Sequence, residues 1–498
     1  MKTLVQKYWL IVALIYLVAG CDSDISGDFG DDPDPGSADF STFVALGDSL
    51  VAGYADDALY RHAQQNSFPA IMAQQFTTVG GGEFDQPLMD TGKTGSLTLS
   101  MVDLGRSDRL VLALNPVPDP DRPVIPEPID PTDTQAIDTR LPGAGMYNNI
   151  GVPGAKSFNG DDAGYGNLNI GPISMMNANP YFARFASDNV VSMIDDAQAQ
   201  VPSFFVLWIG NFDILFYATA GAPGTANPPY GTGSNDVTDP AVFTPAYQGL
   251  VASLKTPTNK GVLVNIPDVS TLSYFTTVPF DAISLDAATA ASANADYAAY
   301  NSALVTAESL MFISAEELTQ RTITFVEGQN ALVIEDESLT FVAGIPSIRQ
   351  ATQKDLVVLP ASRVIGTEQT PGNPATVWGV GTALLDGDVV TEYEFGLIET
   401  ARTAYNVTIK AEADADPDLL LFDAEAFFTE LSTTGILYGS GGISSTFAQG
   451  AGVSLDGLHL TARGNAVLAN EMFKVINAGF GGYIPPVDPS DYTTVFYQ

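Results

Sequence analysis

Four short, largely apolar runs have the pattern of buried parallel strands, which are covered by helices on both faces. Helical patterns lie between these runs or follow them. The clearest are Ser67–Gln75, with Pro69 in its first turn, and the alanine-rich Ala287–Ile313. A third is Leu460–Ile476, for which Thr461 is the expected N-cap. Strands that alternate with helices predict an α/β fold with a doubly wound, mainly parallel sheet. The four runs are Phe43–Leu46, Phe204–Ile209, Gly261–Ile266 and Leu419–Phe422.

Composition predicts how the chain is divided. Residues 21–39 are rich in Asp, Gly, Ser and Pro, with little to bury, and are predicted to be an acidic flexible tether. One enlarged domain is expected over residues 40–485, because motifs near both ends can meet only if the whole chain folds around one sheet. Residues 486–498 are left as a C-terminal tail.

Two insertions are expected in this domain, near residues 80–145 and 315–390. In the first, Asn115–Asp133 alternates Pro with Asp and Glu, which favours an extended, solvated loop. The second is expected to form a small β-rich excursion near the main sheet. Its β-like runs are Thr322–Val326, Ala331–Ile334 and Leu356–Leu359.

The first 20 residues have the pattern of a signal peptide. Two lysines precede the apolar run Tyr8–Val18, which is about half as long as the roughly 20 residues of a membrane span. The following Val18-Ala19-Gly20-Cys21 resembles a bacterial lipobox, which implies cleavage before Cys21 and lipid attachment to its sulfur. The alternative is an ordinary export signal with an incidental cysteine. Cys21 is the only cysteine, so a disulfide within one chain is impossible.

These features predict an exported bacterial lipoprotein of the cell envelope, in the outer membrane by preference, held by its N-terminal lipid. The formal net charge is −38, which argues against nucleic acid or an anionic membrane surface as a partner. The acidic residues are interpreted as a means of keeping the protein soluble in salty surroundings. Residues 22–27 begin like a calcium loop, but Pro33 stands where the bidentate Glu should be, so no metal site is predicted.

Candidate chemistry lies at the two ends of the predicted domain. Gly47-Asp48-Ser49-Leu50 follows the first strand, and a serine there lies at the carboxyl end of the sheet, where open α/β folds bind ligands. Asp456-Gly457-Leu458-His459 holds one of only two histidines. Ser49, His459 and Asp456 can serve as nucleophile, general base and orienting carboxylate. The other histidine, His62, lies in a polar run and is expected at a solvated loop or helix end, without an essential role.

These blocks resemble the SGNH, or GDSL-type, hydrolases, as do Asn149–Gly154 and Gly210-Asn211-Phe212-Asp213 between them. The resemblance implies a flavodoxin-like three-layer α/β/α fold. It also implies ester hydrolysis through an acyl-enzyme, with no cofactor and no metal. The family's oxyanion donors correspond to the backbone N–H groups of Ser49 and Gly154 and to an asparagine amide.

The third oxyanion donor departs from the family pattern, because Phe212 stands where the asparagine is expected and Asn211 comes one place earlier. Asn211 could take over the role, or two backbone donors could suffice at a cost of about 100-fold or more in rate. The third alternative is a weakened or inactive SGNH scaffold that binds lipid or glycan at the surface. The first two are favoured, because Ser49, Asp456 and His459 all remain.

The substrate class follows only loosely from the sequence. The family cleaves esters that include lipids and acetylated sugars, and a lipid anchor favours a lipid or lipid-like ester. Several aromatic residues could line an acyl pocket, although packing in the core is the commoner role of such side chains. These residues are Phe212, Phe216, Tyr217, Tyr274 and Phe275.

Overall fold

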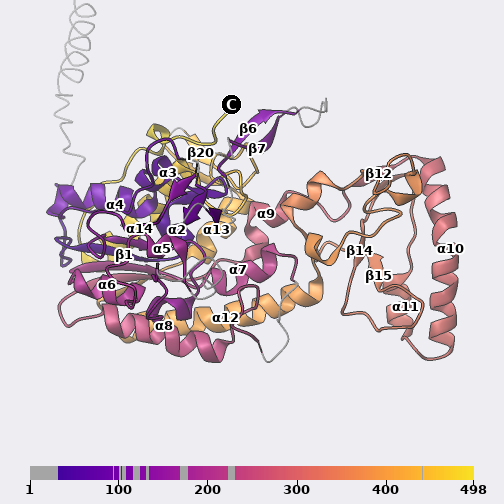
Figure 1. Cartoon of the computed structure of the whole chain (residues 1–498), viewed down its shortest axis with the longest axis horizontal. Helices are drawn as coiled ribbons and strands as arrows, with labels where there is room; N and C mark the ends of the chain where they lie inside the picture. Colours follow the sequence, from indigo (N-terminus) through magenta and orange to yellow (C-terminus); the bar gives the residue numbers. More distant parts are fainter. Residues whose placement is uncertain are drawn as a thin grey trace, which may run out of the picture.

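The centre of the molecule is a five-stranded parallel sheet, in a mixed α/β fold (Figure 1). The computed structural model describes residues 32–93, 95–99, 102–103, 108–115, 124–129, 134–168, 178–222, 230–439 and 441–497. The sheet's strands are β1 (Phe43–Gly47), β9 (Asn149–Gly151), β10 (Phe204–Trp208), β11 (Lys260–Val264) and β18 (Leu419–Phe422). Every residue of β1 and β10 is buried, as their continuous apolar sequence predicts. All four strands expected from the sequence are confirmed.

The strand order is β18-β11-β10-β1-β9. From β1 the chain first passes to β9 on one side, and then crosses back to build β10, β11 and β18 on the other side. The connections that leave β1 and β10 therefore diverge, which opens a crevice at the carboxyl ends of these two strands. Ser49 comes two residues after β1 and Asn211 three residues after β10, so both residues lie at this crevice.

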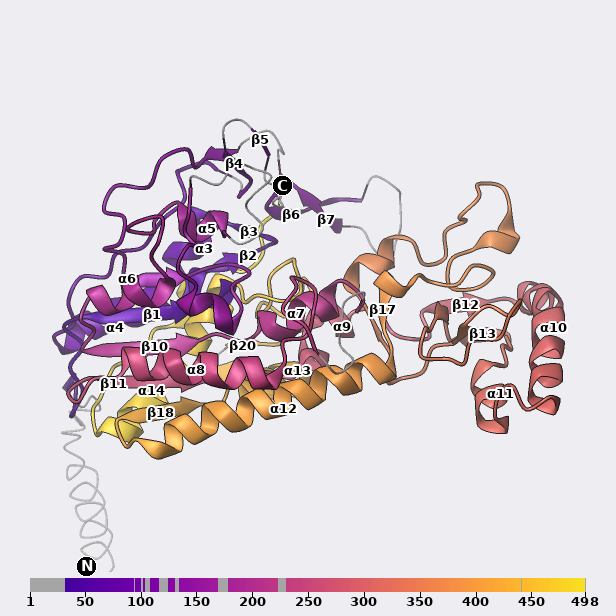
Figure 2. The same cartoon turned by 60° about the horizontal axis from the view of Figure 1, so that its bottom comes forward.

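Helices cover the sheet on both faces. On one face, α4 (Phe68–Phe76) packs against α14 (Ala462–Phe480), and the Phe76 ring contacts Phe43 of β1 and Phe204 of β10. On the other face lie α6 (Met193–Ala199), α8 (Pro240–Leu254) and α12 (Glu392–Ala415) (Figures 1 and 2). The prediction for α4 is confirmed to within one residue, and Thr461 caps α14 by accepting a hydrogen bond from the Gly464 N–H.

The segment between β11 and α12 forms a lobe that projects away from the sheet (Figures 1 and 2). The expectation of an excursion near the main sheet was therefore wrong. The predicted helix α10 belongs to this lobe and has its own small core of Leu304, Ala307 and Ile313. The lobe contains β12 (Ile283–Leu285), α10 (Ala287–Ser309), α11 (Ala315–Arg321), β13 (Gly328–Asn330), β14 (Val333–Glu335) and β15 (Ile348–Gln350).

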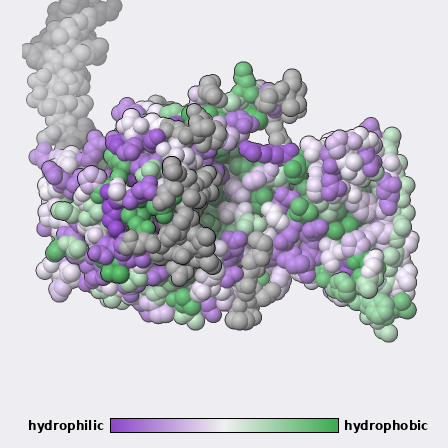
Figure 3. Space-filling model, viewed as in Figure 1, coloured by the Kyte–Doolittle hydropathy of each residue, from purple (hydrophilic) through white to green (hydrophobic). Residues whose placement is uncertain are grey.

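Of the β-like runs expected there, Thr322–Val326 is not a strand, while the other two overlap β14 and β16 (Leu356–Val357). The side chains of Asn301 and Asn294 bond the backbone of Ile323 and Phe325, so they replace strand partners for this run. Apolar side chains gather on the lower end of the lobe, where α11 lies (Figure 3). The turn between α10 and α11 exposes Leu310, Met311 and Phe312 there.

The first insertion also differs from its prediction. Val124–Pro128, inside the expected loop, forms strand β7, which pairs antiparallel with β6 (Leu110–Leu114). Pro126 and Pro128 fit because β7 is an edge strand, where a missing N–H does not interrupt a ladder. Residues 116–123 and 130–133 lie outside the described residues. The remaining strands here are β4 (Leu97–Leu99), β5 (Val102–Asp103) and β8 (Gln135–Ala136).

The described N-terminal residues are paired with the domain. Asp34 exchanges two backbone hydrogen bonds with Tyr483, of 3.0 and 2.7 Å, so the last part of the predicted tether, residues 32–39, is bound to the fold. The predicted signal segment and Cys21 lie outside the described residues. Within the described part of the chain, no helix has the length and apolar composition that crossing a membrane requires.

Candidate active site

Ser49 is placed by a sharp transition from strand to helix. A Cβ on Gly47 would lie 2.0 Å from the Trp208 carbonyl oxygen, so only glycine allows β1 to approach β10 this closely. The next residue, Asp48, caps the short helix α2 (Ser49–Ala52) by accepting a hydrogen bond from the Leu50 N–H. Ser49 is thereby held at the carboxyl end of the sheet and is only 1% exposed.

The loop before α14 brings His459 and Asp456 to this serine. Ser49 Oγ lies 2.6 Å from His459 Nε2, and His459 Nδ1 lies 2.9 Å from Asp456 Oδ2. The other carboxylate oxygen of Asp456 accepts hydrogen bonds from the backbone N–H groups of Leu458 and His459. The three residues that the sequence singled out are therefore in one hydrogen-bonded chain, although 410 positions separate Ser49 from His459.

The ionisation of this pair is set by burial and by mutual attraction. Burial alone would raise the pKa of Asp456, but the charge of His459 and the hydrogen bonds from the His459 ring and from the His459 and Leu458 N–H groups outweigh it and hold this pKa far below its usual range. Burial would lower the pKa of His459, whereas Asp456, with a smaller contribution from Asp48, raises it above the usual value. Asp456 is therefore an anion that holds the Nδ1 proton of His459.

Two neighbouring aspartates, which the sequence analysis missed, hold the histidine loop in place. The Asp56 carboxylate accepts a hydrogen bond from the Leu455 N–H, and the Asp56 N–H donates to Ser454 Oγ. The Asp57 N–H donates to Asp456 Oδ2. Asp56 and Asp57 both have positive φ, 53° and 62°, a conformation that Asp adopts more readily than most residues. The Asp-Asp pair is a turn signal, but the loop that it contacts lies 398–399 positions away, so no local sequence pattern predicts this contact.

Asn211 lies at the edge of the site, bound to Asp48. Its Nδ2 donates a 2.8 Å hydrogen bond to Asp48 Oδ2, which uses one of its two N–H bonds. Its Oδ1 is buried without a hydrogen-bond partner among the described residues. Burial raises the pKa of Asp48 to about 6, and the hydrogen bond from Asn211 partly offsets this rise. The amide of Asn211 therefore has one N–H and one oxygen left for a bound molecule.

Gly154 follows β9 with φ of +81°, a left-handed conformation that favours glycine. A Cβ here would lie 3.1 Å from Cζ of Phe216. The Phe216 ring contacts the Phe212 ring at a tilt of 59°, with the two centroids 4.6 Å apart, so Phe212 packs against the ring that borders Gly154. Among the described residues, the backbone N–H groups of Ser49 and Gly154 have no hydrogen-bond acceptor, as donors reserved for a ligand would.

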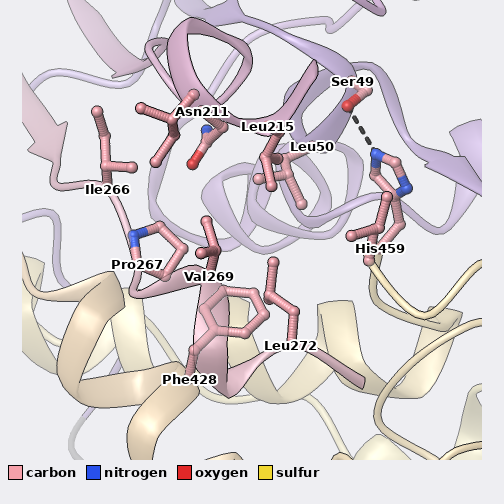
Figure 4. Close-up of a pocket in the computed structure, with 12 residues that line it drawn as sticks. Ser49, Leu50, Asn211, Leu215, Ile266, Pro267, Val269, Leu272, Phe428 and His459 are labelled. Carbon is pink, nitrogen blue, oxygen red and sulfur yellow. Dashed lines mark hydrogen bonds between the residues drawn. The ribbon is translucent and has the colours of Figure 1, made fainter. Parts of the chain in front are cut away.

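A pocket opens beside the serine and histidine (Figure 4). It encloses about 360 Å³, counting the part open to solvent, and Asn211 lies across it from Ser49 and His459. Helix α7 (Phe212–Thr219) supplies one wall, and the chain after β11 supplies another. The remaining lining residues are apolar: Leu50, Ile214, Leu215, Ile266, Pro267, Val269, Leu272, Phe428 and Leu458.

The five aromatic residues considered for an acyl pocket do not line this one. Tyr217 and Phe275 are buried in the core, and Phe212 and Tyr274 pack against it, which is the commoner role of such side chains. Ile214 and Leu215 line it instead, because they follow Asn211 by three and four positions and share its face of α7. His62 lies elsewhere, in α3 (Arg61–Gln65), with Nε2 2.9 Å from Thr493 Oγ1. Comparison of this chain with protein-family models, curated proteins and solved structures finds no match.

Proposed function

We propose that this protein is a serine hydrolase of the SGNH type that cleaves carboxylic esters. The observation that carries the proposal is the buried chain from Ser49 to His459 to Asp456, with separations of 2.6 and 2.9 Å. A serine hydroxyl is a weak nucleophile unless a base lies within hydrogen-bond reach, and a third group must orient that base. Both conditions are met here by residues that the sequence had singled out.

In the proposed reaction, Ser49 Oγ attacks the ester carbonyl carbon while His459 Nε2 takes its proton. Asp456 stabilises the imidazolium that forms, and the backbone N–H groups of Ser49 and Gly154 receive the oxyanion. His459 then gives the proton to the departing alcohol, which leaves an acyl-enzyme on Ser49. A water, deprotonated by His459, releases the acid by the same steps in reverse order.

The arrangement of the sheet supports the family assignment. Numbered along the chain, its strands stand in the order 2-1-3-4-5, with helices on both faces, which is the order of flavodoxin-like three-layer folds. The pocket lies between strands 1 and 3, where such folds bind ligands. Ser49 and Asn211 follow these strands, as the first and third sequence blocks of the proposed family require.

The pocket wall supports an ester with an apolar acyl group. Nine of its twelve lining residues are apolar, and the polar ones are Ser49, His459 and Asn211 at its mouth and edge. A sugar in this space would leave its hydroxyl groups without partners, which is costly in a buried site. We therefore propose that the acyl chain occupies the pocket and that the alcohol points to solvent.

The cellular location is proposed from the sequence of residues 1–21. Cleavage before Cys21 and lipid attachment to its sulfur would place the enzyme on a membrane of the cell envelope. Metabolic labelling with palmitate should mark the wild type and leave Cys21→Ser unlabelled. Label retained by Cys21→Ser would contradict the lipoprotein assignment without affecting the proposed catalysis.

An ester panel tests the activity. Purified protein without residues 1–21 should hydrolyse p-nitrophenyl esters with a preference for acyl chains that fill the pocket, and Ser49→Ala should lower the rate by about 10⁴-fold or more. His62→Gln is the matched control, because it alters the other histidine and should leave the rate unchanged. A wild type that binds the esters without hydrolysing them would favour the alternative of a lipid- or glycan-binding scaffold.

A further inference from the structure

Three carboxylates far apart in the sequence converge at the base of the lobe. Glu337 lies in the turn after β14, Asp386 begins the short 3-10 helix η6 (Asp386–Asp388), and Glu394 lies in the first turn of α12. One oxygen from each of the three lies within 4.8 Å of the others. Like charges this close repel strongly, so the cluster requires a compensating charge.

Glu394 gives an independent sign that the missing partner is a ligand. This residue is only 1% exposed, and its Oε2 accepts hydrogen bonds from the N–H and Oγ1 of Thr391, of 2.8 and 2.9 Å. Its Oε1 is buried and has no hydrogen-bond donor among the described residues. Leaving a buried carboxylate oxygen unpaired costs several kcal/mol, so the carboxylate of Glu394, which lies beside those of Glu337 and Asp386, has an oxygen available for a cation.

Among the residues that the structure describes, none supplies a cation to this cluster. In the described part of the chain, no lysine or arginine forms an ion pair with any of the three carboxylates. Lys354 is paired with Glu392, the first residue of α12.

We propose that Glu337, Asp386 and Glu394 form a binding site for one divalent cation, with Ca²⁺ preferred. Carboxylate oxygens are the ligands of Ca²⁺, which binds them at about 2.3–2.6 Å, so two ligands on opposite sides of the ion lie about 4.6–5.2 Å apart. The 4.8 Å limit of this cluster meets that geometry. Mg²⁺ demands near-ideal octahedral geometry with oxygens at about 2.0–2.1 Å and gives up its waters reluctantly, so it should bind more weakly than Ca²⁺.

A cation here would tie the lobe to the hydrolase body. Glu337 belongs to the lobe, whereas Glu394 belongs to α12, which packs against β18 and α8 under the sheet. Asp386 also approaches Gly221, which comes just after α7. A Cβ on Gly221 would lie 2.5 Å from the Asp386 carbonyl oxygen. The site is therefore connected to the helix that forms one wall of the pocket, and a bound cation would stabilise the orientation of the lobe.

Calorimetric titration of chelator-treated full-length protein with CaCl2 in physiological salt tests this site. We expect one Ca²⁺ per chain with a Kd of about 10⁻⁴–10⁻³ M, the range of extracellular modules, weaker binding of Mg²⁺, and a higher unfolding temperature in Ca²⁺. Glu337→Gln and Asp386→Asn should each weaken binding at least about tenfold, as expected for loss of one charged ligand.

Glu335→Gln is the matched control. It removes a charge two residues from Glu337 that contributes no oxygen to the cluster, so it should leave the Kd within about twofold. Equal weakening by Glu335→Gln would show that the acidic surface merely attracts counter-ions, and this would overturn the proposal. Absence of binding up to about 10 mM Ca²⁺ in folded wild type would also overturn it, and would leave a shared proton as the compensating charge.

Discussion

Substitution of Asp48 by asparagine tests whether burial of this carboxylate sets the stability of the site. Asp48 is fully buried, and it accepts hydrogen bonds from Asn211 Nδ2 and the Leu50 N–H. An asparagine can keep the cap by accepting from Leu50. In the wild type, Asn211 Oδ1 has no hydrogen-bond partner among the described residues. If the Asn211 amide turns over, this oxygen can accept a hydrogen bond from the new NH2 group at position 48.

The magnitude follows from the pKa of Asp48. Burial raises this pKa from its usual 3.8 to about 6, so the folded chain retains a proton that the unfolded chain has already released. Stability is therefore lost as the pH rises from about 4 to about 6, and about two pKa units correspond to about 3 kcal/mol. The asparagine at position 48 does not titrate and avoids this loss.

Urea unfolding of wild type and Asp48→Asn at pH 4 and pH 8 measures the effect. The free energy of unfolding is compared as the difference, variant minus wild type, at each pH. This difference should be larger at pH 8 than at pH 4 by about 2–3 kcal/mol, in favour of the variant. Because Asp48 also raises the pKa of His459, the acid limb of the rate profile should move to lower pH in the variant. A stability difference that is the same at both pH values would refute the reasoning.

Other substitutions test the remaining parts of the site. If the Asn211 amide receives the oxyanion, Asn211→Ala should lower kcat by about 10²–10³-fold with little change in KM. If Asn211→Ala instead leaves kcat unchanged and Phe212→Asn raises it, the backbone donors suffice in the wild type. The rate of the wild type should rise with pH through a midpoint above the usual histidine value of 6.5, because the pKa of His459 is raised, and a midpoint below it would contradict the His459–Asp456 geometry. Gly154→Ala should lower both the rate and the unfolding temperature, since its φ of +81° and the nearby ring disfavour a side chain, and unchanged values would remove Gly154 from the site.

Much of the sheet and of the serine, histidine and aspartate chain follows from local sequence. The buried strands β1, β10, β11 and β18 are continuous apolar runs. Ser49 and Asn211 follow two of them within three residues, so the sequence places both residues at the carboxyl end of the sheet. The apolar lining of the pocket was missed, because residues such as Ile266 and Phe428 come from segments whose proximity depends on the packing of whole elements.

The lobe shows a second limit of local patterns. The composition of α10 predicts a helix correctly, but an alanine-rich helix carries no sign of whether it covers the sheet or stands apart. The cluster of Glu337, Asp386 and Glu394 draws its members from three elements, so no spacing in the sequence resembles a metal loop. Strand β7 was missed because its prolines are acceptable only at the edge of a hairpin.

Covalent labelling by a fluorophosphonate probe, followed by mass spectrometry of the modified peptide, tests the proposed nucleophile most directly. Such probes react with a serine only where a base has activated it, so they report the working arrangement of Ser49 and His459 rather than their presence alone. We predict one modified residue per chain, Ser49, with labelling lost in Ser49→Ala, nearly abolished in His459→Gln and unchanged in His62→Gln. A folded wild type that takes up no probe, or that is modified at another serine, would contradict the assignment of Ser49 as the nucleophile.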